Sequence, residues 1–347
     1  MRLLVLYEEL AGYFISSIAH FAQTTKIDVV IMHKSSNVVA PFKLESSTYI
    51  QLKNRDEISE QELYQFVNTL QPNYLFCGGW AHKPYLKICK SFKGNIPIVV
   101  GFDNQWIGNL KQQLAALYAK VYFKKLFDKA FVPGGLQKKF AQKIGFKEKD
   151  ISLGAYCCDY QLFSNLYTDT QKKKHENFPK VFLYTGRYSQ EKGITDLWNA
   201  FVELEDHKNW ELWCVGVGVI PPIKHPKIKH FGFVQPKELA PIIEKSGVFI
   251  LPSHFEPWGV VVHEYTAAGF PVLCSTKVGA SEVFLEDNVN GYSFTPGNKN
   301  EIKNVLNKVI QMDETKLIEM SQKSHQISQK ITNDSWTNSL KQLFGIK

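Results

Sequence analysis

Two glutamates, Glu256 and Glu264, lie eight positions apart in the run PSHFEPWGVVVHEYTAAGFPVLCS. Pro257 disfavours a helical backbone at Glu256, whereas Gly259 and the valines after it predict the start of a helix. The first carboxylate is therefore expected on a loop and the second about one turn inside a helix. The first helical N–H groups, which bind anions, come between them. The pattern favours a ligand with a charged centre and hydroxyls at both ends, such as a nucleotide sugar. The alternative is a solvated loop acid and an ordinary helix-surface acid.

Two cations form a second constellation. The predicted strand VFLYT continues into GRYSQEKG and then into a helix with apolar residues at helical spacing. Arg187 and Lys192 are therefore expected on a strand-to-helix loop, where Gly186 and Gly193 allow close backbone approach. Two such cations could neutralise a departing diphosphate without a metal ion. The alternative is a surface loop with incidental charges.

The elements that must position these residues alternate between short β-rich runs and helical patterns, which predicts parallel sheets of an α/β protein. A length of 347 residues favours two domains. We expect a first domain over 1–163, a polar linker over 164–179 and a second domain over 180–329. A C-terminal helix over about 330–347 could pack back on the first domain. The expected strands are 2–7, 28–33, 74–77, 97–101 and 129–132, then 180–184, 210–215, 228–233, 248–252, 271–275 and 291–294.

Basic charge is concentrated in the first half of the chain. Residues 1–160 hold 20 Lys and Arg against 13 Asp and Glu, and residues 111–149 contain ten lysines interleaved with Tyr and Phe. Such a surface would suit peripheral contact with an anionic membrane. A solvated helix face is the alternative. No nucleic-acid partner is expected, because no recognised binding module accompanies the lysines.

Composition excludes several classes of protein. No apolar run approaches the roughly 18 residues of a membrane span. The N-terminus MRLLVLYEEL lacks the pattern of a signal peptide, so we expect a cytoplasmic protein, peripheral at most on the inner face of the cell membrane. The six cysteines show no metal-ligand spacing and are expected to be reduced core thiols. No metal site and no cofactor are expected.

Together these motifs resemble the retaining glycosyltransferases of family 4, the glycosyl transferases group 1, which have the GT-B fold. The similar segments are GRYSQEKG, PSHFEPWG with EYTAAGFPV, and GASEVFLEDNVNGYSF, over about residues 181–297. LGAYCCDYQLF is a looser match upstream. The resemblance implies two Rossmann-like, doubly wound parallel sheets that face a deep interdomain cleft, with the acceptor bound by the first domain and the donor by the second.

The resemblance also implies roles for the named residues. Arg187 and Lys192 would bind the donor diphosphate, Glu264 the ribose hydroxyls, and Glu256 the hydroxyls of the transferred sugar. Backbone groups of the donor site would come from Gly186, Gly259, Val260 and Val261. The implied chemistry is front-face departure of the nucleoside diphosphate with retention of configuration and without a metal ion.

The first domain departs from the family pattern. Its first strand is followed by YEELAGYF, with Gly12 alone, where many relatives have a glycine pair. A glycine pair follows another strand instead, at Gly78 and Gly79. His82 and Asp103 also follow strands, and ligands of doubly wound sheets bind at such strand ends. Both are candidates for contacting the sugar or taking the acceptor proton, and both could equally be capping or turn residues.

The resemblance implies transfer of a hexose from a UDP- or GDP-sugar to a hydroxyl of a glycan or glycolipid, in bacterial cell-surface polysaccharide or lipopolysaccharide-type synthesis. Two alternatives remain open. One is a non-catalytic partner protein of the same fold, and the other is a nucleotide-sugar hydrolase or epimerase. An acceptor-independent turnover assay would separate the two enzymatic hypotheses.

Overall fold

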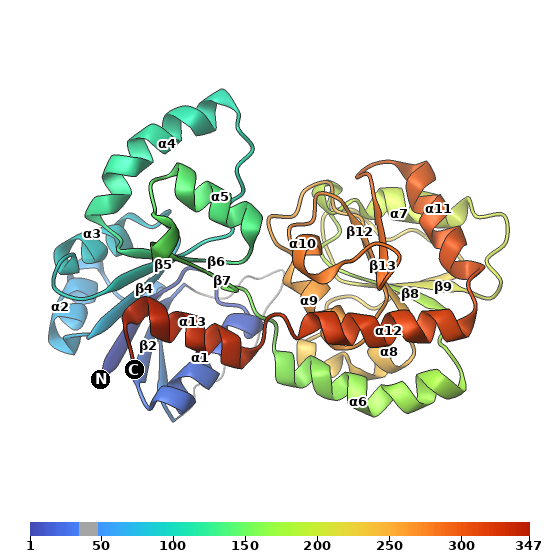
Figure 1. Ribbon diagram of the computed structural model, residues 1–347, viewed down its shortest axis with the longest axis horizontal. Helices are drawn as coiled ribbons and strands as arrows, with labels where there is room; N and C mark the ends of the chain where they lie inside the picture. The colour runs from blue at the N-terminus through green and yellow to red at the C-terminus, as the bar shows by residue number, and fades with distance from the viewer. Residues whose placement is uncertain (35–47) are drawn as a thin grey trace. The chain divides into compact units, whose positions relative to one another are not determined.

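A computed structural model describes residues 1–34 and 48–347 of the chain. It divides into two compact units, which Figure 1 shows coloured along the chain. Unit 1 comprises Met1–Cys157 and Asn333–Lys347, and unit 2 comprises Cys158–Thr332. Each unit is built on one parallel sheet, so the prediction of a doubly wound α/β fold is confirmed.

The sheet of unit 1 has seven parallel strands in the order β3-β2-β1-β4-β5-β6-β7. The order reverses between β1 and β4, which lie side by side although β2 and β3 separate them in the sequence. The register pairs Leu4 with Val30 on one side and with Leu75 on the other. The strands are β1 Arg2–Leu6, β2 Asp28–His33, β3 Ile50–Asn54, β4 Tyr74–Gly78, β5 Ile98–Gly101, β6 Lys129–Val132 and β7 Ile151–Leu153.

Helices cover both faces of this sheet, because alternate strand residues point to opposite sides and most of them are apolar. On one face α1 packs beside α13, and Trp336 of α13 contacts the rings of Phe14 and Phe131. A second buried cluster contains residues of α2, α3, α4 and α5. The helices are α1 Gly12–Thr25, α2 Glu60–Leu70, α3 Lys83–Phe92, α4 Leu110–Tyr122, α5 Gly135–Lys143 and α13 Asn333–Phe344.

The sheet of unit 2 has six parallel strands in the order β10-β9-β8-β11-β12-β13, and it reverses between β8 and β11. The strands are β8 Val181–Thr185, β9 Glu211–Val215, β10 Ile228–His230, β11 Val248–Leu251, β12 Val272–Ser275 and β13 Gly291–Phe294. The helices are α6 Tyr160–Glu176, α7 Ile194–Val202, α8 Ala240–Glu244, α9 Val260–Ala267, α10 Ser281–Phe284, α11 Lys299–Ile310 and α12 Glu314–Ser328. A 3₁₀ turn, Gln190–Lys192, precedes α7.

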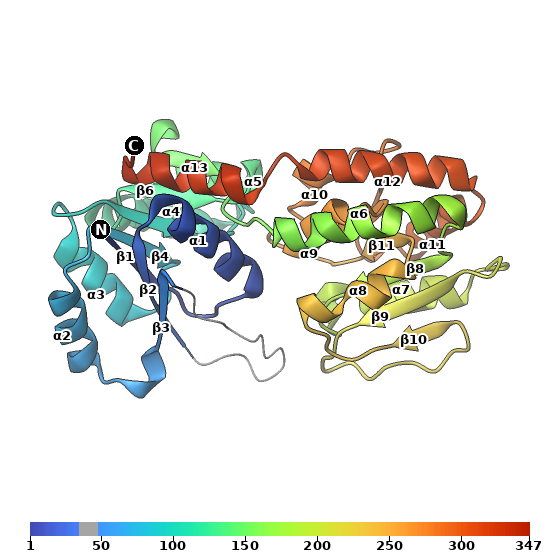
Figure 2. The ribbon, with the colours of Figure 1, turned by 90° about the horizontal axis from the view of Figure 1, so that it is seen from below.

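The structure corrects the expected linker over 164–179. Residues up to Glu176 belong to the helix α6, which packs on α9 and α12 within unit 2 (Figure 2). Phe163 and Leu166 are buried, and Asp159 caps the helix by accepting a hydrogen bond from the Leu162 N–H at 3.4 Å. Most of the polar run after them lies on the exposed side of this helix, with Thr170 and Lys174 as buried exceptions. Its polarity therefore mainly reflects solvent exposure and not the loss of secondary structure.

Two strands of unit 1, β3 and β7, were not expected from the sequence. Strand β3 (IQLKN) buries only Ile50, and β7 (ISL) is three residues long with no fully buried position. Both are edge strands, so neither shows the continuous apolar run that identified the inner strands. Within the described part of the chain, no helix has both the length and the apolar character to cross a membrane.

Candidate functional site

The two predicted motifs of unit 2 follow neighbouring strands. GRYSQEKG comes directly after β8, and PSHFEPWG comes directly after β11. Because β8 pairs with β11 at the reversal of strand order, both loops leave the sheet at its carboxyl edge, side by side. Ligands of doubly wound sheets bind at this place. The fold therefore brings together segments about 65 residues apart in the sequence.

Lys192 and Glu256 are in direct contact. The Nζ atom of Lys192 donates a hydrogen bond to Oε2 of Glu256, and the two side chains form an ion pair. They are 16% and 15% exposed, so both are largely withdrawn from water but retain an open side. A pair at this depth is less screened than a surface pair, and its charges are held in place before any ligand arrives.

Further polar contacts fasten the same two loops. The His254 N–H donates to the carbonyl oxygen of Glu191 at 2.8 Å. The Nε2 atom of His254 lies 2.5 Å from Oδ2 of Asp196 in the first turn of α7. The backbone of Glu256 is held on its other side, since its N–H donates to Lys277 and its carbonyl accepts from Gly279, each at 3.0 Å. Lys192 and Glu256 thus project from a rigid pair of loops.

Two glycines make this close approach possible. Gly193 has φ +64, and a Cβ atom there would overlap the carbonyl oxygen of Pro252. Gly259 has φ +90, and a Cβ atom there would lie 2.9 Å from Cγ of Glu256. Any other residue at either position would strain the backbone. At Gly193 it would also push the two loops apart, and at Gly259 it would displace the Glu256 side chain.

Arg187 takes a different position from Lys192. Its side chain is 60% exposed, and its guanidinium lies 3.9 Å from the Glu191 carboxylate. Its backbone is fixed, because the hydroxyl of Tyr184 donates to the Arg187 carbonyl at 2.8 Å. Gly186 before it donates its N–H to Val215 at 3.0 Å. The structure therefore gives Arg187 a fixed attachment and a side chain free to reach a ligand.

Helix α9 begins at Val260, as the glycine and the valines predicted. Gly259 is its N-cap and supplies no side-chain cap, so the amides of Gly259, Val260 and Val261 lie where a helix lacks internal acceptors. Glu256 precedes this turn and contacts Lys192. The start of α9, the Lys192 ammonium and the Glu256 carboxylate therefore lie close together.

Glu264 lies one turn along α9, about 6 Å from Val260 along the helix axis. Burial, with a smaller contribution from the Asp159 carboxylate, raises the pKa of its carboxyl to about 7. The hydroxyl of the next residue, Tyr265, lies 2.6 Å from Oγ1 of Thr185 at the end of β8. This contact fixes α9 against the strand that leads into the Arg187 loop.

Three buried donors of these loops have no hydrogen-bond partner within the part of the chain that the structure describes. They are the hydroxyls of Ser189 and Ser253 and the indole N–H of Trp258. Buried polar groups are normally paired, so a concentration of unpaired donors marks a place where water or a ligand binds. Ser189 belongs to the loop after β8, and the other two belong to the loop after β11.

In unit 1, His82 is the N-cap residue of α3 and its ring packs on Tyr85 with centroids 4.2 Å apart. Its Nδ1 atom is buried and has no hydrogen-bond partner among the described residues. Burial lowers the pKa of His82, and the nearby Lys34 lowers it further. Burial and Lys34 therefore favour the neutral form of the His82 imidazole.

Asp103 follows β5 and lies in a cluster of tyrosines. Tyr7 forms hydrogen bonds with Tyr13 and Tyr156. Burial raises the pKa of Tyr7 to about 12, and the charge of Asp103 contributes to the rise. Gly78 leaves room for the Tyr7 ring, which a Cβ atom at that position would meet. His82 responds instead to Lys34, Glu8, Arg55 and Asp56. The two candidates thus have different surroundings.

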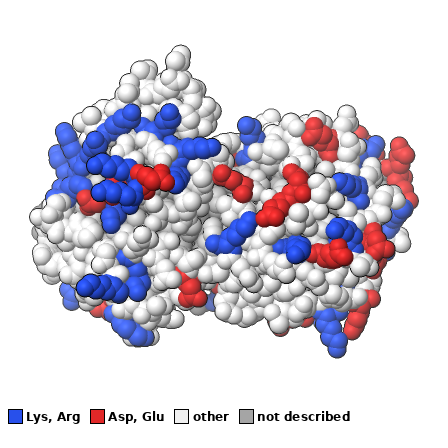
Figure 3. Space-filling view, viewed as in Figure 1, with Lys and Arg blue, Asp and Glu red and all other residues white. Residues whose placement is uncertain are grey.

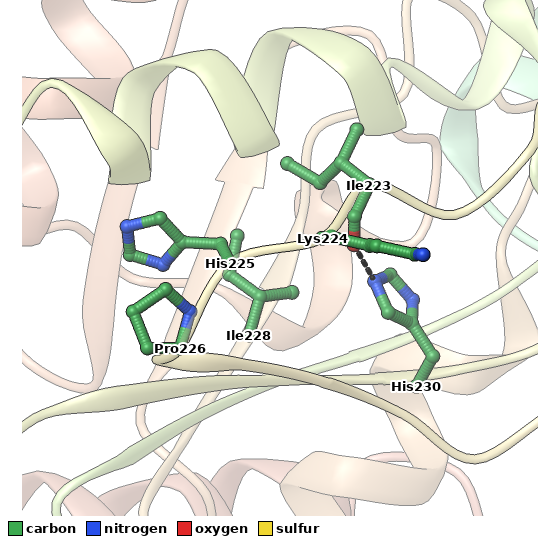
Figure 4. Close-up of a pocket in the computed structure, with 6 residues that line it drawn as sticks. All are labelled: Ile223, Lys224, His225, Pro226, Ile228 and His230. Carbon is green, nitrogen blue, oxygen red and sulfur yellow. Dashed lines mark hydrogen bonds between the residues drawn. The ribbon is translucent and has the colours of Figure 1, made fainter.

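A surface hollow in unit 2 contains none of the predicted residues. Figure 4 shows it between Ile223, Lys224, His225, Pro226, Ile228 and His230. The Nε2–H of His230 donates to the Ile223 carbonyl at 3.1 Å, and Nδ1 lies 3.0 Å from the hydroxyl of Tyr188. These contacts make His230 a structural residue behind the Arg187 loop.

His263, adjacent to Glu264, is a core residue. Its Nδ1 accepts from the Cys158 N–H, and its Nε2–H donates to Ser328, each at 3.1 Å. Burial lowers its pKa to about 3, so the imidazole is neutral. Over residues 1–34 and 48–347, no group of three or more His, Cys, Asp or Glu could hold a metal ion.

Sequence reasoning missed the residues that support the site. The His254–Asp196 pair and the Tyr265–Thr185 contact each join segments far apart in the sequence. Asp159 could have been noted from the sequence, because it belongs to the LGAYCCDYQLF segment. Its proximity to Glu264 could be recognised only from the structure.

The comparisons with known proteins agree with these motifs. Residues 168–330 match the family Glycosyl transferases group 1. An uncharacterized glycosyltransferase of Methanocaldococcus jannaschii is 31% identical over 133 residues, which is 35% of this chain and 34% of the relative. Glycogen synthase of Mycobacterium tuberculosis is 32% identical over 117 residues, 31% of this chain and 28% of the relative. The alignments therefore span about a third of these relatives' lengths.

Similarity of fold extends over the whole chain. The crystal structure of HepE from Anabaena in complex with UDP superposes with a TM-score of 0.75 at 14% identity, covering 99% of this chain and 100% of that one. At this identity the likeness shows the fold alone. The second unit thus matches the glycosyl transferases group 1 family over residues 168–330, and the two parallel sheets of the chain have the GT-B fold.

Proposed function

We propose that the protein is a retaining glycosyltransferase that transfers a hexose from a nucleoside diphosphate sugar to a hydroxyl of a glycan or glycolipid. The observation that carries this proposal is the Lys192–Glu256 pair beside the start of α9. Lys192 and the first amides of α9 would bind the diphosphate. Glu256 would accept hydrogen bonds from the transferred sugar, and Glu264 from the ribose.

In the proposed reaction, the bond from the anomeric carbon to the diphosphate oxygen breaks and a bond to the acceptor oxygen forms on the same face. The acceptor proton leaves with the diphosphate or passes to a base of unit 1. Lys192, Arg187 and the α9 amides would stabilise the charge that develops on the leaving group. The exposed Arg187 side chain would move onto the phosphates when the donor binds.

We assign acceptor recognition to unit 1. Asp103 and the hydroxyls of Tyr7, Tyr13 and Tyr156 are groups that can bind sugar hydroxyls, and they lie together near strand ends. Asp103 and His82 are the two candidate bases for the acceptor proton. The donor's base and sugar are proposed as UDP- or GDP-linked hexose, which fits the complexes of HepE with UDP and UDP-glucose only by analogy.

The test is a two-stage assay. Thermal stabilisation by UDP, GDP and ADP, each with and without an attached sugar, identifies the nucleotide by mass action. Release of nucleoside diphosphate is then measured with and without glycan or glycolipid acceptors. Acceptor-dependent release with retained configuration supports the proposal. Equal release without an acceptor would indicate a hydrolase, and stabilisation without any turnover of the stabilising sugar donor across the acceptor panel would indicate a non-catalytic binding protein.

A further inference from the structure

Helix α4 of unit 1 has an unusual distribution of side chains. It buries only small residues, Ala116 and Ala119, toward the sheet. Its large apolar residues face water, each between 62% and 78% exposed; they are Leu110, Leu114, Leu117, Tyr118 and Val121. Ile107, just before the helix, is 66% exposed. A helix that stabilises a monomer would be expected to bury such residues.

The exposed residues form one stripe. At about 100° per residue, the five large side chains of α4 lie within an arc of about 100° on the face opposite the two alanines. An arc of this width is what an amphipathic helix normally buries. Contiguous exposed apolar surface of this kind marks a place of interaction, and not the scattered apolar residues found on any protein surface.

Positive charge flanks the stripe. The stretch from Leu110 to Lys125 contains Lys111, Lys120, Lys124 and Lys125 and no Asp or Glu. Figure 3 shows Lys and Arg side chains gathered around the part of unit 1 that carries α4 and α5, beside white surface. By contrast, Figure 3 shows both signs of charge interspersed on the visible face of unit 2.

The apolar stripe and the flanking lysines together indicate which kind of partner binds α4. A second copy packed stripe to stripe would bring the two sets of lysines together, and like charges oppose such an interface. An acyl-chain boundary with anionic headgroups would accept the apolar stripe and attract the flanking lysines at the same time. We propose that α4 docks this protein on an anionic lipid bilayer, with the stripe Leu110–Leu114–Leu117–Tyr118–Val121 inserted at the interface.

The proposal does not depend on the transfer reaction, because vesicle binding is measured without any sugar. The protein is sedimented with vesicles of phosphatidylcholine alone and of phosphatidylcholine mixed with phosphatidylglycerol. The expected result is binding to the anionic vesicles that weakens as salt is raised. The apolar variant Leu114→Gln/Leu117→Gln should bind at least tenfold more weakly, because two leucines would no longer insert.

In the charge variant Lys120→Gln/Lys124→Gln/Lys125→Gln, the affinity for anionic vesicles should fall on the order of fivefold per lysine. Much of the salt dependence of binding should also be lost. A matched control is Val219→Gln, an 88% exposed residue of unit 2, which should bind as the wild type does. All these side chains are exposed, so melting temperatures should stay within a degree or two of one another.

Two results would overturn the proposal. One is wild-type protein that ignores anionic vesicles, or a Leu114→Gln/Leu117→Gln variant that binds them unchanged. The other is a wild-type dimer in analytical ultracentrifugation that the same variant converts to monomers, which would identify a second copy as the occupant of the stripe.

Discussion

The two sheets reverse their strand order at corresponding places, but the loops at these places are built differently. In unit 2, the loops after β8 and β11 are joined by the Lys192–Glu256 and His254–Asp196 pairs. In unit 1, the loop after β1 meets the end of β4, where the Tyr7 ring lies over Gly78. The first arrangement fixes charge, which suits a diphosphate, whereas the second presents an aromatic surface and hydroxyls, which suit a sugar.

The most severe test of this contrast is Lys192→Ala. The variant loses a cation for the diphosphate and leaves Glu256 without its partner, so kcat/KM should fall by about 100-fold. Initial rates with the stabilising donor measure the effect. Lys299→Ala is the matched control, because it removes an exposed lysine paired with Glu203 in the same unit and should leave rates unchanged. Wild-type rates in Lys192→Ala would remove the diphosphate assignment.

Gly193→Ala tests whether activity depends on the close contact between the loops after β8 and β11. The added methyl would overlap the Pro252 carbonyl, so Lys192 and Glu256 should separate and activity should fall by tens of fold. Gly232→Ala is the control, since Gly232 has a similar φ of +71 with open space around its would-be Cβ. Both variants carry backbone strain, so a comparable loss of activity in both would mean that strain alone is responsible.

Asp103→Asn tests the other half of the contrast. If unit 1 serves the acceptor, the change should lower turnover by about tenfold through one lost polar interaction and leave nucleotide affinity unaltered. His82→Gln provides the comparison, because that residue lies in separate surroundings. A weakened nucleotide affinity in Asp103→Asn, measured by calorimetry, would contradict the division of roles.

Under the proposed function, Glu264 should make nucleotide binding depend on pH. Its pKa of about 7 in the free protein means that the carboxyl is increasingly protonated below pH 7. Ribose hydroxyls would donate to the ionised form, so affinity should fall by up to about tenfold per pH unit below 7 and be constant well above it. Calorimetry from pH 5.5 to 8.5 measures this trend. Glu264→Gln should bind more weakly and lose the trend, and an unchanged trend would assign it to another group.

Lys174 is a buried lysine outside the proposed site. It therefore shows what burial alone does to a lysine. It is buried in α6 over the Phe270 ring, and its Nζ atom has no hydrogen-bond partner in residues 1–34 and 48–347. Burial lowers its pKa from 10.5 to about 7. The unfolded chain therefore binds more protons between these values, so Lys174 lowers stability most below pH 7 and progressively less as pH rises to 10.5.

Lys174→Met should accordingly raise the melting temperature at pH 7 and leave turnover unchanged. In the wild type, this group should contribute a rise in stability of at most about 1.4 kcal/mol per pH unit between pH 7 and 10.5. Denaturant titrations of both proteins at pH 7 and 9 measure the difference. Equal pH dependence in the two proteins would show that Lys174 is not the group responsible.

Much of this fold could be predicted from the sequence. Inner strands such as β2 and β11 are continuous apolar runs, and Gly259 with its valines identified the start of α9. Edge strands β3 and β7 lacked that signal, and the exposed polar side of α6 resembled a linker. In both places the apolar pattern that identifies helices and strands is missing, because these elements are exposed to solvent.

The site was less predictable than the fold. Motif spacing identified Lys192, Glu256 and Glu264 as candidates, but not the ion pair between the first two. The aromatic and lysine content of residues 111–149 was visible in the sequence, whereas the outward orientation of the α4 leucines was not. Helical periodicity shows that a stripe exists, and only the packing of Ala116 and Ala119 shows which face is turned inward.

The most direct test of the central claim is a crystal structure of the protein with the nucleoside diphosphate sugar that stabilises it most. The account predicts phosphate oxygens within hydrogen-bond distance of Lys192 Nζ and of the first amides of α9, with ribose hydroxyls on Glu264. A diphosphate bound elsewhere, for example at the hollow around His225 and His230, with the Lys192–Glu256 pair unoccupied by ligand, would contradict it.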